Sequence, residues 1–118
     1  MKRAIIYSFV ITLILSLTHF NLSSAFGERI DYKKLYRKHK CIKCHGWDGK
    51  GTKRGKKLGA QDFTDAEWQA SVTDEQLINS ITNGKKKMPK QGGSKMTPEE
   101  IKAMVKYVRY FAPKKKRR

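Results

Sequence analysis

Two cysteines and a histidine stand close together in the chain, as Cys41-Ile42-Lys43-Cys44-His45. Two thiols at this spacing can add to the two vinyl groups of one haem, and the imidazole that follows can bind its iron. The sequence has only these 2 cysteines in 118 residues, so no disulfide framework accompanies them. The motif therefore predicts one covalently attached haem c, held by Cys41 and Cys44, with His45 as an iron ligand.

A methionine in a later loop is the expected second axial ligand. Met88 lies in the polar segment 85–96, directly before Pro89 and outside any helical spacing. Pro89 fixes a backbone dihedral angle and lowers the entropy cost of presenting the sulfur, which favours Met88 over its competitor Met96. A thioether opposite an imidazole favours Fe(II) and raises the reduction potential.

Other uses of these residues stay open. His39 is the only other imidazole after residue 25, and it could give bis-His ligation, but it lies on the segment that carries the proximal ligand. Cys41 and Cys44 could instead bind zinc or form a thioredoxin-like pair, although no second ligand pair accompanies them and no predicted strand precedes them. Haem-stain retention on a denaturing gel separates the last two uses from covalent haem.

Helices must position these ligands, because no useful length of the chain alternates apolar and polar residues with the period of two that strands show. Apolar residues with helical spacing and capping residues predict helices instead. The predicted helices cover residues 31–40, 65–70, 74–83 and 98–112. The Gly-rich segment 46–62 is predicted to be loop. The expected fold class is all-α, a bundle of about four helices around one haem.

Capping residues predict where these helices begin and end. Asp31 is the expected N-cap of the first helix. The other three begin at Thr64, Thr73 and Thr97, each with Glu or Gln three residues later, so that the two side chains can satisfy free amides reciprocally. Gly84 suits the C-cap of the helix predicted over residues 74–83, because glycine readily adopts a left-handed backbone conformation.

The last predicted helix carries an apolar stripe that marks the core. It has Pro98 at its first position and stops before Pro113. The stripe consists of Ile101, Met104, Val105, Val108 and Phe111. Met104 sits in the middle of the stripe, so it is assigned to core packing and not to the iron.

The N-terminal segment has the three parts of a secretory signal peptide. Lys2 and Arg3 are followed by the apolar run 4–17 and by small residues up to Ala25. The run is short for a membrane span. We therefore expect residues 1–25 to be a cleaved signal peptide and the protein to be periplasmic, with an uncleaved anchor as the alternative.

Positive charge dominates the composition, with 27 Lys and Arg against 10 Asp and Glu, a formal net charge of +17. Many of these cations fall in the two loops expected to border the haem, where they would steer acidic redox partner proteins; a merely solubilising surface is the alternative. The basic tail, residues 113–118, is expected to be disordered and to make weak contact with an anionic membrane surface. Charge alone would also suit nucleic acid, but an exported chain would seldom meet it.

These features together resemble the class I c-type cytochromes, of the small monohaem bacterial kind. The resemblance covers nearly all of residues 26–112, the expected cytochrome c domain. It rests on the haem motif with Gly46, on Asp48-Gly49-Lys50-Gly51, on Met88-Pro89 and on the last helix with its Tyr107.

The resemblance implies that the first and last helices cross, with Tyr36 against Met104 or Tyr107. Trp68 is either a donor to a haem propionate or a plain core aromatic. Relatives often carry a proline whose carbonyl orients the proximal imidazole, but none occurs between His45 and Met88. A carbonyl of residues 58–60 is expected to accept that N–H instead.

The function that the resemblance implies is electron transport by a soluble carrier that is not an enzyme, because His/Met ligation leaves no open iron site. The alternative is the haem domain of an enzyme or gas sensor, in which Met88 is displaced from the iron. A self-contained two-haem peroxidase would need two haem motifs, and the sequence has one.

Overall fold

The computed structural model describes residues 29–114, which fold into helices joined by loops and contain no strand. The expected signal peptide, residues 1–25, and most of the basic tail lie outside the described residues. The helices are α2 (Tyr32–Lys38), α3 (Ile42–His45), α4 (Lys53–Lys57), α5 (Ala66–Ser71), α6 (Asp74–Asn83) and α7 (Pro98–Tyr110). In the described part of the chain, no helix combines the length and apolar character that crossing a membrane requires.

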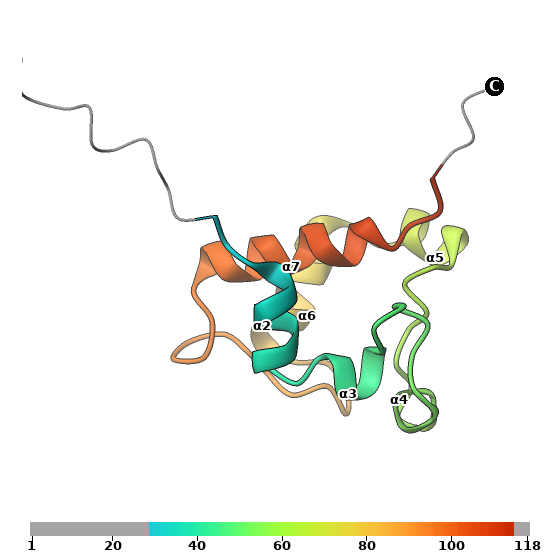
Figure 1. Ribbon diagram of the computed structural model, residues 1–118, viewed down its shortest axis with the longest axis horizontal. Helices are drawn as coiled ribbons and strands as arrows, with labels where there is room; N and C mark the ends of the chain where they lie inside the picture. Colours follow the sequence, from blue (N-terminus) through green and yellow to red (C-terminus); the bar gives the residue numbers. More distant parts are fainter. Residues whose placement is uncertain (1–28, 115–118) are drawn as a thin grey trace, which may run out of the picture.

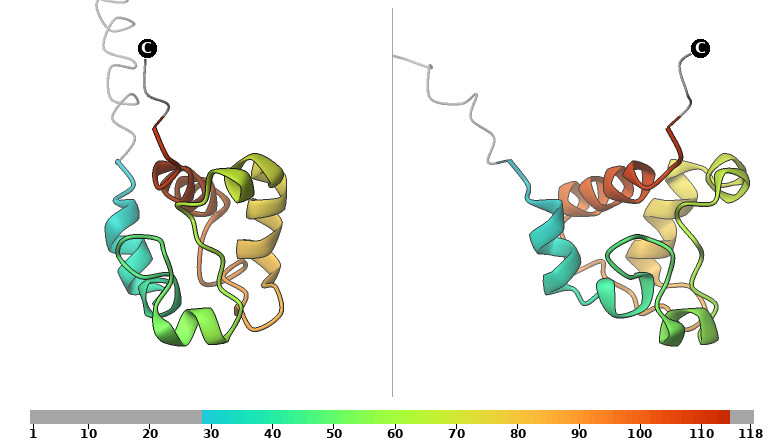
Figure 2. Two further views of the ribbon diagram at one scale, coloured as in Figure 1. Left: turned by 90° about the vertical axis from the view of Figure 1, so that its right-hand side faces the viewer. Right: turned by 45° about the vertical axis from the view of Figure 1, so that its right-hand side comes forward.

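The last helix, α7, is the one against which two other helices pack. Both α2 and α6 pack against α7, while α4 packs against α3. Figures 1 and 2 show α3 and α4 on the side of the molecule away from α7. The all-α fold class is confirmed, and the crossing of the first and last helices is present.

The predicted caps of three helices are confirmed. Asp31 accepts a hydrogen bond from the Lys34 amide at 2.9 Å and begins α2. Thr73 and Thr97 each form the reciprocal capping box that begins α6 and α7. Gly84, at φ +78°, ends α6. Local side-chain chemistry therefore sets these boundaries.

The start of α5 differs from the prediction by one residue. Asp65, and not Thr64, is the N-cap, because its carboxylate accepts a hydrogen bond from the Trp68 amide at 2.9 Å. Thr64 is engaged elsewhere: its amide and hydroxyl donate to Asp62 at 2.8 and 2.6 Å. The predicted capping box at Thr64 is wrong, although the helix itself is present.

Two short helices were not predicted. The segment 46–62, expected to be loop, contains α4, which begins where the Thr52 hydroxyl accepts a hydrogen bond from the Gly55 amide at 3.0 Å. The first helix ends earlier than predicted, because Lys40 takes a left-handed backbone conformation at φ +60° and turns the chain into α3. This turn gives the cysteine motif a helix of its own.

The hydrophobic core lies under α7. Met104 is 3% exposed and belongs to it, as predicted. The ring of Tyr36 on α2 meets Tyr107 on α7 edge to face, with centroids 5.1 Å apart, which confirms the expected contact at the crossing. The core therefore fixes the helix that precedes the cysteine motif.

Candidate haem-attachment site

Helix α3 and its N-cap carry the predicted attachment residues within about one turn of helix. Cys41 is its N-cap residue, and Cys44 and His45 lie within it. Neither thiol is in a disulfide, and both side chains are half-buried. Burial raises the pKa of the Cys41 thiol to about 11, so this sulfur is a protonated thiol at neutral pH.

The carbonyl groups at the end of α3 are covered by the segment that follows. The Thr52 hydroxyl donates to the Lys43 carbonyl at 2.8 Å, and the Thr52 amide donates to the Cys44 carbonyl at 2.9 Å. The Gly51 amide donates to the His45 carbonyl at 3.0 Å. The free carbonyls of a helix end are thus satisfied by one short stretch of chain.

Glycine is required where α4 meets α3. A Cβ atom on Gly55 would lie 1.9 Å from the carbonyl oxygen of Cys44 and 2.6 Å from its carbonyl carbon. No real Cβ atom approaches backbone so closely, so only glycine allows this contact. The unpredicted helix α4 therefore supports the attachment motif directly.

A buried tyrosine holds the chain just after the motif. The Tyr36 hydroxyl donates to the Gly46 carbonyl at 2.8 Å, and Tyr36 is 2% exposed. Burial, with a smaller contribution from the neighbouring Cys41, raises the pKa of the Tyr36 phenol well above its ordinary value of 10.0. The phenol therefore remains a hydrogen-bond donor at neutral pH.

The His45 imidazole is held by an aromatic ring. It stacks on Phe63 with centroids 4.4 Å apart and an angle of 16° between the planes. Burial lowers the pKa of His45 to about 4, so the ring is neutral at neutral pH, which is the form that binds a metal. Its Nδ1 is buried and has no hydrogen-bond partner among the described residues.

The expected carbonyl acceptor for His45 in residues 58–60 is therefore wrong. The physical reason is α4, which ends just before this segment and leaves Leu58 39% exposed at the surface. The Gly59 carbonyl accepts from the Gln61 side chain at 3.5 Å. Nothing in the sequence marks Phe63 as the residue that contacts the imidazole instead.

His39 lies at the C-terminal end of α2, before the motif. Its Nε2 is buried without a hydrogen-bond partner among the described residues. Within residues 29–114, no three His, Cys, Asp or Glu side chains are grouped so that they could hold a metal ion. The alternative of a zinc site at Cys41 and Cys44 is therefore not supported.

The Met88 loop is closed at its two ends. Lys85 and Met88 exchange backbone hydrogen bonds of 3.1 and 2.9 Å across a tight turn. Further on, the amides of Gln91 and Gly92 donate to carbonyls of α6 at 2.9 and 3.0 Å. Met88 itself is half-buried and packs against the hydrophobic core, as Cys41 also does.

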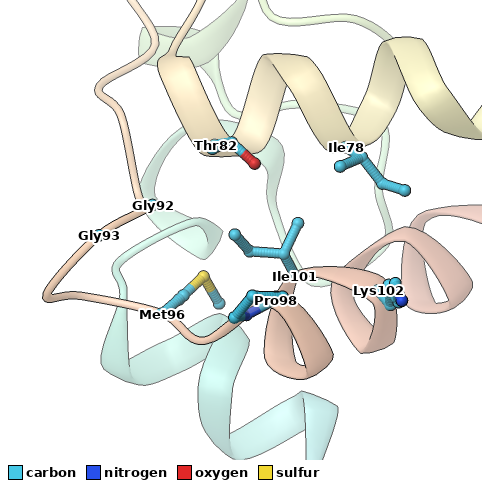
Figure 3. A pocket seen from close by; sticks show the side chains of 8 residues that line it. All are labelled: Ile78, Thr82, Gly92, Gly93, Met96, Pro98, Ile101 and Lys102. Carbon is cyan, nitrogen blue, oxygen red and sulfur yellow. The ribbon is translucent and has the colours of Figure 1, made fainter.

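Met96, the competing sulfur, lies deeper. It is 2% exposed and faces an apolar pocket of about 260 Å³ between α6 and the start of α7 (Figure 3). The pocket is lined by Ile78, Thr82, Gly92, Gly93, Met96, Pro98, Ile101 and Lys102. None of these belongs to the attachment motif, so Met96 is placed with the packing of two helices.

The aromatic side chain of Trp68 extends the stack on the proximal side. It is half-buried, and its ring lies 5.4 Å from that of Phe63 at an angle of 24°. Trp68 thus packs as an aromatic next to the core. The donation of its indole N–H to a haem propionate stays a prediction.

The residues present fit a covalent haem. Two unpaired thiols sit on one helix, and a neutral imidazole follows them. The buried Nδ1 of this imidazole lacks a partner, and Nε2 makes no hydrogen bond to the described residues and is not among their buried, unsatisfied atoms. That leaves Nε2 as the nitrogen available to iron.

Comparisons with known proteins agree with this fit. The family model "Cytochrome C oxidase, cbb3-type, subunit III" matches residues 30–108. The FixP subunit of the cbb3-type cytochrome c oxidase of Azorhizobium caulinodans is 34% identical over 68 residues, which is 58% of this chain and 22% of that protein. The CcoP subunit of Rubrivivax gelatinosus is 32% identical over 85 residues, 71% of this chain and 24% of that protein. The chain thus spans about a quarter of the length of these relatives.

A solved structure matches along its whole length. The KustC0563 c-type cytochrome is 49% identical, with a TM-score of 0.65, and the match covers 71% of this chain and 100% of that chain. A mutant of the same protein matches with a TM-score of 0.63. The haem motif, the all-α fold and these matches show that the chain belongs to the cbb3-type subunit III family of c-type cytochromes, and that it is an electron carrier with one covalently bound haem c.

Proposed function

We propose that the protein is an exported electron carrier that passes one electron between redox partners through a haem ligated by His45 and Met88, without catalysing a reaction of its own. The proposal is supported most by the pairing of a neutral, half-buried imidazole on α3 with a half-buried thioether in a loop closed at both ends. Haem supplies the reversible one-electron couple, and the polypeptide holds its two axial ligands. With both positions filled, no iron site remains for a substrate.

The choice of Met88 over Met96 follows from their surroundings. The Met88 backbone is fixed by its exchange of hydrogen bonds with Lys85, while its side chain remains half-buried. Met96 is enclosed by α6 and α7 and is 2% exposed. To bind iron, the Met96 side chain would have to leave the space between α6 and α7, and the cavity left there would destabilise the fold.

Paired substitutions test the ligand. In the purified haem protein, Met88→Ala should abolish the sulfur-to-iron charge-transfer band and open the ferrous iron to carbon monoxide, whereas Met96→Ala should keep the band and only lower stability. Loss of the band in Met96→Ala alone would move the ligand to that residue. Rapid, tight binding of carbon monoxide by the unsubstituted protein would favour the gas sensor or enzyme with a displaceable methionine.

We further propose that the partners present an acidic surface. The ten cations of the two expected haem-bordering loops are all exposed: Lys43, Lys50, Lys53, Arg54, Lys56, Lys57, Lys85, Lys86, Lys87 and Lys90. Within residues 29–114 the one side-chain ion pair joins Arg109 and Asp74, so these ten are not neutralised by carboxylates of the described chain. Uncompensated cations of this kind raise the association rate with an acidic partner.

Salt dependence tests the docking surface. The electron-transfer rate with an acidic redox protein should fall as ionic strength rises, and Lys86→Glu with Lys87→Glu should reduce it at low salt. Lys102→Glu with Lys106→Glu, on the exposed side of α7, makes the same charge change as a control. Equal effects of the two pairs would indicate net charge alone and contradict a localised surface.

Two features support export and a redox partner within an oxidase complex. Residues 1–25 have the pattern of a signal peptide, and the relatives FixP and CcoP are named as subunits of cbb3-type cytochrome c oxidases. We propose a periplasmic location on this basis. Fractionation of the native host, with mass determination of the mature chain, tests the location and the cleavage together: a mass that includes residues 1–25 would indicate an anchor.

A further inference from the structure

The proximal imidazole lies at one end of a three-ring stack. The Phe63 ring stacks on His45 at 4.4 Å, and the Trp68 ring stacks on Phe63 at 5.4 Å. The planes of neighbouring rings differ by 16° and 24°. Nδ1 of His45 has no acceptor among the described residues, so no hydrogen bond from this atom fixes the ring and the stack is a contact that restrains its rotation.

The backbone of Phe63 is fixed on both sides. Its amide donates to the Gly49 carbonyl at 2.8 Å, and its carbonyl accepts from the side-chain amide of Gln69 at 2.8 Å. Phe63 is 6% exposed and Gln69 is 9% exposed. A displacement of the Phe63 backbone would therefore break a buried hydrogen bond and leave its partner unsatisfied.

Gln69 is itself oriented by the last helix. Its side-chain nitrogen makes a second donation, to the Val108 carbonyl at 3.0 Å, and its side-chain oxygen accepts from the Arg109 guanidinium at 2.9 Å. Both donors and one acceptor position of the amide are thus used. Reversal of the amide would place donors against the guanidinium and an acceptor against two carbonyls, so a single orientation is favoured.

The Arg109 guanidinium joins three helices. It donates to the Gln69 carbonyl at 2.7 Å, to the Val72 carbonyl at 2.6 Å and to the Asp74 carboxylate at 2.8 Å. These contacts tie α7 to the end of α5 and the start of α6. The planar fork of arginine suits such simultaneous donation, and lysine could not reproduce it.

We propose that Gln69 and Arg109 are positioning residues for the proximal ligand: they hold the ring of Phe63 against His45 and thereby set the orientation of the imidazole, and with it the reduction potential of the haem. Outer contacts of a ligating imidazole commonly tune its metal. Here the hydrogen bonds of Gln69 and Arg109 act on the imidazole through the ring of Phe63. In this site the stacked ring takes the role that a hydrogen-bond acceptor for Nδ1 would otherwise have. The inference rests on the proposed function, in which His45 binds the iron.

Two substitutions break the chain of contacts at different points. Gln69→Leu removes the hydrogen bonds at similar side-chain volume, and Phe63→Leu removes the stacked ring without touching the polar network. Both should shift the midpoint potential in the same direction. Both should also change the paramagnetically shifted NMR signals of the His45 ring in the ferric protein, which report the orientation of the imidazole.

Thr97→Ala is the matched control, because it removes the capping box at the start of α7 and touches neither the stacked rings nor the contacts of Arg109. It should lower stability and leave the potential and the His45 signals unchanged. Arg109→Lys keeps the charge and should give a smaller shift in the direction of Gln69→Leu.

The outcomes separate the inference from the proposed function. Potentials and His45 signals that match those of Thr97→Ala, in both Gln69→Leu and Phe63→Leu, would overturn the positioning role while leaving His45 as ligand. Should Gln69→Leu fail to fold, Phe63→Leu with Arg109→Lys decides the question. Absence of any paramagnetically shifted His45 signal in the unsubstituted protein would instead overturn the ligand assignment itself.

Discussion

The two sides of the candidate haem site are built in different ways. The proximal segment around His45 is braced along its length: the carbonyls of α3 accept from Gly51 and Thr52, and the buried Tyr36 hydroxyl holds Gly46. The distal loop around Met88 has fewer buried contacts: the Lys85 turn and two amides that donate to α6 hold its backbone, and the Gln91 and Lys95 side chains donate to carbonyls within it.

This difference indicates which ligand the polypeptide holds more firmly. The proximal imidazole is held by contacts with the folded chain, among them the stacked ring of Phe63. The distal sulfur belongs to a residue whose backbone is fixed by the Lys85 turn and whose side chain is half-buried against the core. We therefore expect changes on the proximal side to affect the whole fold, and changes on the distal side to affect ligation first.

The largest effect is expected from Gly55→Ala on the proximal side. The added methyl group would meet the backbone of Cys44 at 1.9 Å, and neither helix can yield without moving the attachment motif. We expect a loss of about 3 kcal/mol or more in the free energy of unfolding, measured by guanidinium titration.

Gly59→Asn provides the control for this change. Gly59 has a left-handed backbone at φ +82°, which asparagine tolerates, and nothing lies within 4 Å of the position of its Cβ atom. Its cost should be far smaller. Equal losses from the two substitutions would show that α4 does not brace α3.

Gly92→Ala is the corresponding change on the distal side. The new methyl group would lie 2.6 Å from Thr82 Cγ2 and 2.9 Å from the Thr82 carbonyl oxygen, so the loop must move away from α6. We expect a cost of about 1 to 3 kcal/mol and a weakened sulfur-to-iron band in the optical spectrum. Gly93→Asn, at an open position with φ +75°, should leave the band intact.

Tyr36→Phe tests a single proximal hydrogen bond. Removal of the hydroxyl leaves the Gly46 carbonyl without its buried donor, and we expect a cost of about 1 to 2 kcal/mol in the free energy of unfolding at neutral pH. Tyr110→Phe removes a hydroxyl from a residue that is 64% exposed and should cost almost nothing.

The same substitution predicts a pH dependence. The pKa of Tyr36 is raised above its ordinary value of 10.0 in the folded state, so the unfolded chain loses this proton first. The stabilisation that the Tyr36 hydroxyl gives is complete below pH 10. It is lost as the pH rises above 10 towards the pKa of Tyr36 in the folded state. Above pH 10 the unsubstituted protein should lose stability more steeply than Tyr36→Phe; parallel curves would contradict the buried donor.

The smallest effect is expected from Lys86→Gly in the distal turn. Lys86 has a left-handed backbone at φ +53°, which glycine adopts without steric cost. We expect a gain of about 0.5 to 1 kcal/mol, with the optical spectrum unchanged. Lys87→Gly, at a position without this conformation, should instead lower stability slightly.

Short-range signals made much of the fold predictable from the sequence. A capping residue and its partner lie three positions apart, so Thr73 and Thr97 could be read without knowledge of the fold. The prediction of an N-cap at Thr64 was wrong because a second local partner exists. Asp62 lies two positions away and accepts a hydrogen bond from the Thr64 hydroxyl. The cysteine motif is likewise local, and its chemistry depends on spacing alone.

Contacts between distant residues could not be read in this way. Helix α4 contains a glycine and four basic residues, and it exists because Gly55 can rest against Cys44. The contacts between Arg109 and Gln69 join residues 40 positions apart. Phe63 carries no periodic signal that would assign it to the imidazole, since its place depends on where α4 and α5 begin.

The contact between Gly49 and Phe111 has a consequence for the order in which the protein can mature. A Cβ atom on Gly49 would lie 2.7 Å from the Phe111 ring, so the loop after the motif is shaped to receive a residue at the very end of the last helix. Synthesis delivers the cysteines before that residue. A haem-ligating enzyme that acts during synthesis would therefore meet the motif before Phe111 packs against Gly49.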